Sequence, residues 1–175
     1  MGNQTNKIKR VSRILQKMFL AIAWLLPVGI SLFWLGLNQI HTAVQIPMFQ
    51  VPSYPLPLAM ILGGLALSMI KVTCLVATAF SLSRLFSLYA QGFIFTRQNS
   101  QIIRRIAKLV LLYIPISVAV RTSLVYLLTS RGVAKFEISV STEELGYLLL
   151  GGTVLVIAWI MEEARSLKND FDMTI

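Results

Sequence analysis

Four nearly continuous apolar runs, separated by short polar or proline-rich segments, dominate this sequence. The runs cover residues 18–40, 58–82, 106–128 and 145–161. A hydrocarbon core about 30 Å thick requires about 20 apolar residues per helix. Long runs of this kind, without the alternation of a half-buried strand, are typical of membrane-spanning helices. The pattern therefore predicts an all-α membrane protein with four transmembrane helices.

The connections after the first and third runs have a different pattern. Residues 41–57 contain four prolines and no Lys or Arg, which excludes a regular helix. In residues 129–142, the apolar side chains of Phe136, Ile138 and Val140 alternate with polar ones, which is the period of a strand. We expect both connections to lie on the same, outer side of the membrane and to contain short extended or β-like segments.

Small residues indicate where the helices end and approach one another. Gly92 is a good helix stop, and Thr96 is a suitable N-cap for the helix that follows. Small residues at four-residue spacings in the second run favour close packing of a neighbouring helix. They are Ala59, Gly63, Gly64 and Ser68.

Composition supports a membrane protein of one domain. The chain has 175 residues, of which 56% are hydrophobic and 13% charged, whereas soluble domains are about a quarter charged. Four spans leave no room for a further globular domain. We therefore expect residues 1–175 to form a single integral membrane domain.

The basic residues are distributed unevenly, and their positions predict the orientation. Five precede or open the first run, and four lie between the second and third runs, where there is no acid. The outer connections carry only Arg131 and Lys135. The positive-inside rule then predicts that both termini lie in the cytoplasm. The same rule accounts for the net charge of +9, so we expect no direct nucleic-acid partner.

No catalytic or metal-binding pattern is recognisable. The single histidine, His41, has no partner at ligand spacing, and the single cysteine, Cys74, lies inside the second run. The spans contain no nucleophile–base set, phosphate-binding glycine loop or paired carboxylates. We therefore expect no catalytic residue, no cofactor and no metal, and the chain is not expected to be an enzyme.

Two ionisable residues inside the apolar runs are candidates for a special role. Lys71 lies in the second run and Arg121 in the third, where an unpaired charge is costly. We expect both to form ion pairs with the fourth helix, Lys71 at its inner end and Arg121 at its outer end. The candidate partners are Glu162 and Glu163 at the inner end, and Glu143 and Glu144 at the outer end. An anion-transport role for the two cations is the alternative.

Two stretches carry motifs. Residues 92–99 read Gly-Phe-Ile-Phe-Thr-Arg-Gln-Asn, followed by Ile-Arg-Arg-Ile at 103–106, and residues 167–175 read Leu-Lys-Asn-Asp-Phe-Asp-Met-Thr-Ile. They resemble the segments G-x-I-F-T-x-x-N … L-R-x-I and L-(K/R)-x-E-N-D-L-T-(I/V) of DUF2975, a bacterial family of small four-helix membrane proteins. The tail departs from the family at Asp170 and Phe171, where Glu and Asn are usual.

The resemblance marks out two groups of candidate functional residues. The central motif contains Gly92, Phe95, Thr96, Asn99, Arg104 and Arg105. The C-terminal motif contains Leu167, Asp170, Asp172, Met173, Thr174 and Ile175.

What the resemblance implies about function is limited. The family has no established activity, and its members are often encoded beside a small helix-turn-helix protein. It therefore implies a protein of the bacterial cytoplasmic (inner) membrane that is paired with a cytoplasmic regulator.

Two hypotheses about function remain open at this point. The first is a non-enzymatic, regulatory or sensory membrane protein whose cytoplasmic loop and tail engage a protein partner. In this view the acidic tail lies as a short extended strand or plug against the basic loop, with Phe95 as a contact. A frayed, solvated terminus is the alternative for the tail. The alternative is a small permease or export subunit that acts as a homo-oligomer among the membrane lipids.

Overall fold

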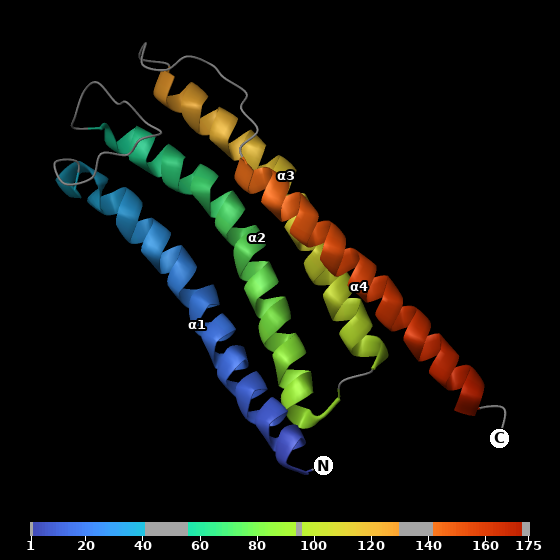
Figure 1. The fold of residues 1–175 in the computed structure, drawn as a ribbon. Helices are drawn as coiled ribbons and strands as arrows, with labels where there is room; N and C mark the ends of the chain where they lie inside the picture. Colours follow the sequence, from blue (N-terminus) through green and yellow to red (C-terminus); the bar gives the residue numbers. More distant parts are fainter. Residues whose placement is uncertain (1, 41–55, 94–95, 130–141, 173–175) are drawn as a thin grey trace.

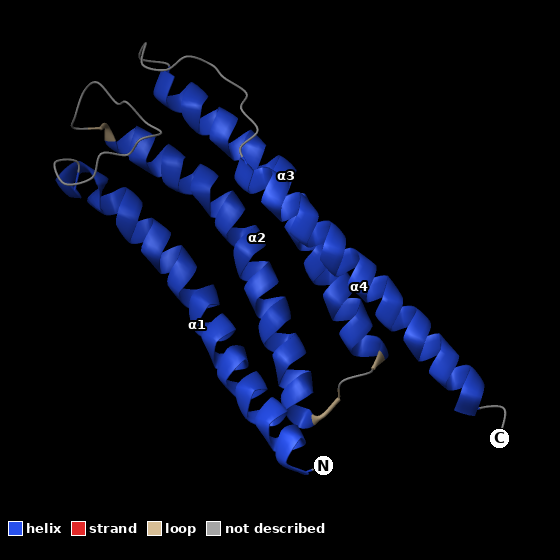
Figure 2. Ribbon diagram, in the orientation of Figure 1, coloured by secondary structure: helices blue, strands red, loops and turns tan. Residues whose placement is uncertain are grey.

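The computed structural model describes residues 2–40, 56–93, 96–129 and 142–172 of the chain. Within these ranges it describes the side chains of residues 9–39, 56–93, 96–127, 145–163 and 166. Four helices make up nearly all of this part (Figure 2). They are α1 (Gly2–Ile40), α2 (Leu58–Gln91), α3 (Arg97–Thr129) and α4 (Thr142–Asp172).

Each helix contains one of the predicted spans and is longer than it. Four stretches are long and apolar enough to cross a membrane: Lys9–Gln39, Leu58–Gln91, Arg97–Leu127 and Leu145–Glu163. Pro27 and Pro115 lie inside α1 and α3, where a proline is tolerated in membrane helices. The prediction of four spanning-length helices is confirmed, and no strand occurs among the described residues. The expected β-like segments of residues 41–55 and 130–141 lie outside that part of the chain.

The helices form an open row rather than a closed bundle. Among the described residues, the backbones of α1 and α2, of α2 and α3, and of α3 and α4 come within 8 Å of each other, and those of the other helix pairs do not. Figure 1 shows this order, with α4 crossing α3 at the edge of the row that is opposite α1. The connection between α2 and α3, the start of α1 and the end of α4 share one end of the molecule, which we call the basic end.

The α1–α2 contact is built around a tryptophan that lies over a glycine. Trp34 is 7% exposed, and its indole Nε1 donates a hydrogen bond to Ser68 Oγ at 2.9 Å. A Cβ at Gly64 would overlap the indole ring. The predicted close approach at the small residues of α2 is therefore confirmed for Gly64 and Ser68. The surrounding buried cluster joins Trp34 to α2 and α3 through Ile61 and Val120.

A second buried cluster joins α2, α3 and α4 near the basic end. It contains Leu85 of α2, Ile103 of α3 and Ala158 of α4, and Ala158 is fully buried. Further along α4, Gly151 brings the helix close to Leu111 of α3. Small residues in α4 thus permit the crossing with α3.

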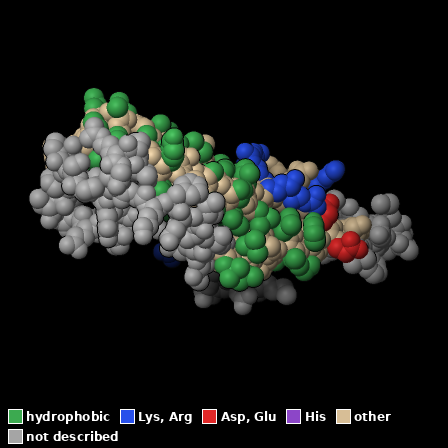
Figure 3. Space-filling model, turned by 90° about the horizontal axis from the view of Figure 1, so that it is seen from above, with side chains coloured by type: hydrophobic (Ala, Val, Ile, Leu, Met, Phe, Trp, Pro, Cys, Tyr) green, Lys and Arg blue, Asp and Glu red, His purple; other side chains and the backbone are tan. Residues whose placement is uncertain are grey.

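Large apolar side chains are exposed along all four helices in the described part of the chain. Trp24 is 67% exposed and Leu32 is 65% exposed. Figure 3 shows apolar side chains over much of the visible surface, with Lys and Arg side chains gathered near the acidic ones. So much exposed apolar surface is expected of a protein whose solvent is lipid.

Candidate functional site

The central motif begins with a glycine that ends α2. Gly92 has φ 92° and ψ 4°, a left-handed conformation that favours glycine. Its N–H donates to the carbonyl of Tyr89, and the N–H of Phe93 donates to the carbonyl of Leu88, both at 3.0 Å. These two bonds form a Schellman motif. The predicted helix stop at Gly92 is therefore confirmed.

Thr96 and Asn99 begin α3 and connect it to the end of α2. The backbone N–H of Asn99 donates to Thr96 Oγ1 at 3.3 Å, as expected of an N-cap, so that prediction is also confirmed. The side chain of Asn99 is fully buried, and its Nδ2 donates to the carbonyl of Phe93 at 2.6 Å. Three residues of the central motif therefore have a structural role in holding the α2–α3 connection.

The next residue connects this region to α4. Ser100 is 3% exposed, and its Oγ donates to Oε2 of Glu162 at 2.7 Å. The carboxylate lies at the N-terminal turn of α3, where the helix dipole favours negative charge. This bond places the first turn of α3 beside the end of the spanning part of α4.

The arginines of the basic end fall into two groups. Arg104 is half-buried, and its buried Nε has no hydrogen-bond partner among the described residues. Arg84, Arg97 and Arg105 are exposed and line a hollow between α2 and α3. The four cations therefore belong to helices rather than to a loop.

The structure gives Lys71 an aromatic neighbour. Its ammonium lies 5.6 Å from the centre of the Tyr113 ring, a cation–π distance. Tyr113 in turn packs edge-on against Tyr147 of α4, with ring centroids 5.1 Å apart. Tyr113 lies thirteen residues further along α3 than Ser100, the partner of Glu162, so the two contacts are about 20 Å apart. The geometry does not bring Lys71 and Glu162 together.

The predicted ion pairs of Arg121 are outside what the structure describes. Arg121 lies half-buried in α3, but the side chains of Glu143 and Glu144 are not among the described residues. Their pairing with Arg121 stays a prediction. Glu163 is exposed, one residue after Glu162.

The tail does not have the expected extended conformation where it is described. α4 continues without interruption through Leu167 and Asp170 to Asp172. The sequence contains neither Gly nor Pro after Gly152, so no helix-breaking residue interrupts α4 before Asp172. Met173, Thr174 and Ile175 lie outside the described residues, as does Phe95, the contact expected for the tail.

Comparison with known proteins gives the same family as the motifs described above. The model of DUF2975, a protein family of unknown function, matches residues 18–175. The chain belongs to the DUF2975 family. No curated protein and no solved structure matches it.

The family resemblance expected from the two motifs is thus confirmed, and the structure adds residues that the motifs did not identify. Ser100 of this DUF2975 chain was not a candidate, although it forms the hydrogen bond to Glu162. Arg84, Gln98 and Gln101 are likewise absent from the two groups of candidate residues, although they line the hollow between α2 and α3. Periodicity along α3 could have placed Gln98, Gln101 and Arg105 on one face, because residues three or four apart share a face.

Proposed function

We propose that this DUF2975 chain is a small, non-enzymatic, multi-pass protein of the bacterial cytoplasmic membrane that holds a regulatory protein at its cytoplasmic end. The basic end is the cytoplasmic end in this proposal, because it carries the Lys and Arg excess of the positive-inside rule. By family analogy, the partner is a helix-turn-helix regulator that the membrane protein retains or releases.

The observation that carries the proposal is the projection of α4. The helix continues for ten residues after Glu162, which is about 15 Å of helix past its hydrogen bond to α3. Figure 1 shows this segment running beyond the start of α3 and away from α1 and α2. A helix that extends past its own neighbours offers surface to a partner, and this one contains Leu167, Asp170 and Asp172 of the C-terminal motif.

Hydrogen bonds at the basic end restrain the residues from which α4 projects. The Schellman motif at Gly92, the cap at Thr96 and the buried Asn99 restrain the α2–α3 connection. The bond between Ser100 and Glu162 then holds the base of the projecting segment. A partner bound to α4 would therefore dock on a preformed surface, which lowers the entropic cost of association.

The test is deletion of residues 170–175 in cells that co-express a small helix-turn-helix regulator of the kind encoded beside DUF2975 members. We expect the deletion to abolish co-purification of the regulator, while the amount of membrane protein in the membrane fraction stays within about twofold. The four spanning segments end before residue 170, so insertion does not depend on the deleted part.

A matched control separates the motif from the length and charge of the tail. The control keeps the same six residues in a scrambled order, and we expect it to lose the regulator as well. A deletion variant that still co-purifies with the regulator at the wild-type level would contradict the proposal.

A further inference from the structure

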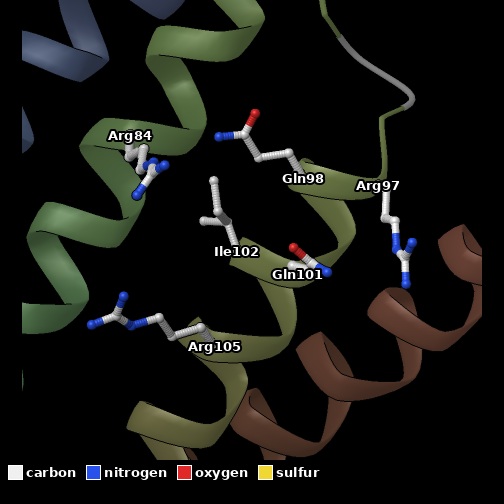
Figure 4. A pocket seen from close by; sticks show the side chains of 6 residues that line it. All are labelled: Arg84, Arg97, Gln98, Gln101, Ile102 and Arg105. Atoms are coloured by element: carbon white, nitrogen blue, oxygen red, sulfur yellow. The ribbon is translucent and has the colours of Figure 1, made fainter.

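Two hollows meet at a pair of arginines on the α2–α3 face of the basic end. The first has a volume of about 520 Å³ and is lined by Arg84 of α2 and by Gln98, Ile102 and Arg105 of α3, among others. Figure 4 shows the Arg105 side chain and the amide of Gln98 extending from α3 toward α2, where Arg84 lies. Arg97 lines the same hollow from the side nearer α4.

The charge of this hollow is one-sided. Arg84 and Arg105 are both exposed, and neither forms an ion pair or hydrogen bond with a described residue. Two guanidinium groups beside the same hollow repel each other unless an anion lies between them. The planar, five-donor guanidinium matches phosphate oxygens, and the amide of Gln98 adds a neutral donor. The first hollow therefore suits a phosphate group.

The second hollow indicates what is attached to the phosphate. It has a volume of about 380 Å³, shares Arg84 and Arg105 with the first, and continues along α2 past Phe80, Ala77 and Val76, with the hydroxyl residues Ser81 and Thr73 also in its lining. A cationic end that leads directly into a mainly apolar groove suits an amphipathic ligand. A soluble phosphate would use the first hollow and leave the groove empty.

The depth of these residues in the membrane agrees with a lipid. Arg84 lies twenty-six residues after Leu58, which is about 39 Å along α2, and Val76 lies about 27 Å along it. With Leu58 at the opposite boundary of a hydrocarbon core about 30 Å thick, Val76 lies about 3 Å inside the core, and Phe80, about 33 Å along α2, lies at its boundary. Arg84 then lies in the headgroup layer.

We propose that Arg84 and Arg105 bind the phosphate of an anionic phospholipid, and that one of its acyl chains lies along Val76, Ala77 and Phe80. Basic sites between helices at a membrane surface are a known mode of lipid headgroup recognition. The site does not depend on which leaflet faces the basic end, and it uses none of the tail residues of the proposed partner site.

The headgroup is tested by native mass spectrometry of the full chain in detergent, titrated with a phosphatidylglycerol of defined chain length. The Arg84→Gln/Arg105→Gln variant should bind about 30-fold more weakly than wild type, because each basic residue near an anionic headgroup contributes about fivefold. The matched control is Arg10→Gln/Arg13→Gln, which removes the same charge from two exposed arginines of α1. This control should keep wild-type affinity.

The groove is tested by filling it. Ala77→Phe should weaken binding of the long-chain lipid at least fivefold, whereas Ala66→Phe, at an exposed position of the same helix, should not change it. Inorganic phosphate and phosphatidylcholine serve as the remaining probes. Wild type should prefer phosphatidylglycerol to phosphatidylcholine, and millimolar phosphate should not displace the lipid.

Three results would overturn the inference. Equal losses in the two double arginine variants would mean that net charge alone attracts the lipid. Displacement by inorganic phosphate, with no effect of Ala77→Phe, would identify a soluble phosphate ligand instead. Equal binding of phosphatidylcholine would remove the role of the arginines in selecting an anionic headgroup.

Discussion

At the scale of single residues, Asn99 is notable because its polar amide side chain is fully buried. The side chain donates to the carbonyl of Phe93 across the α2–α3 connection. Its backbone N–H is the one that Thr96 caps. A buried polar group of this kind is stable only while its partners remain in place. Asn99 therefore couples the end of α2 to the start of α3.

The prediction at this scale is that Asn99→Asp destabilises the protein strongly. The carboxylate cannot donate to the Phe93 carbonyl, and it places a buried negative charge beside that oxygen, so the unfolding free energy should fall by about 3 kcal/mol. Thermal unfolding in detergent measures the loss. The matched control, Gln98→Glu, makes the same chemical change at the exposed neighbouring residue and should stay within about 0.5 kcal/mol of wild type.

The pH dependence of stability provides a second test of the Asn99→Asp variant. A protonated carboxyl regains an O–H donor, so the loss caused by Asn99→Asp should shrink as the pH falls. Stability equal to wild type at neutral pH would show that the bond to Phe93 does not hold the connection.

At the scale of elements, the contact between α1 and α2 depends on a glycine, which has no side chain to occupy the contact. Gly64 leaves the space that the indole of Trp34 occupies, and Ser68, one turn later, accepts the indole N–H bond. An indole is rigid and cannot move aside as the end of a long aliphatic chain would. The pair therefore determines how closely the two helices approach.

The prediction for this element is that Gly64→Ala lowers the unfolding free energy by about 1–3 kcal/mol, the usual cost of overpacking. The matched control is Gly29→Ala in α1, where a Cβ would have nothing within 4 Å. Ala is the better helix former, so the control should be neutral or up to about 1 kcal/mol more stable. If the two variants have equal melting temperatures, the close contact does not contribute to stability.

At the scale of the whole molecule, the helices form an open row with most of their apolar surface outward. In the described structure the backbone of α1 lies close only to that of α2, and the backbone of α4 only to that of α3. Lipid covers such a row without the penalty that water would impose. Association with a second copy, which the homo-oligomer hypothesis requires, stays a prediction.

The orientation of the row is the prediction at this scale. In a Cys74→Ser background, single cysteines at Gln50 and Ser139 should react with an impermeant thiol reagent applied to intact cells. Cysteines at Gln98 and Asn169 should react only after the membrane is opened, because the positive-inside rule places them in the cytoplasm. Labelling of Gln98 in intact cells would reverse the orientation and contradict the charge argument.

The sequence by itself determined the elements and the family. Apolar runs predict helices reliably in membranes, because a spanning backbone must satisfy its own hydrogen bonds. The boundaries at Gly92 and Thr96 followed from local backbone chemistry, since a left-handed glycine and a threonine cap act over a few residues. The DUF2975 motifs were likewise recognisable from short stretches of sequence.

Only the tertiary structure decided which side chains meet. That Lys71 lies over Tyr113 while Glu162 bonds to Ser100 depends on how each helix is rotated and at what level its neighbour crosses it. The same holds for the hollows shared by Arg84 and Arg105, which lie twenty-one residues apart on two helices. Helix crossing depends on the packing of side chains from both partners, which no pattern within one segment specifies.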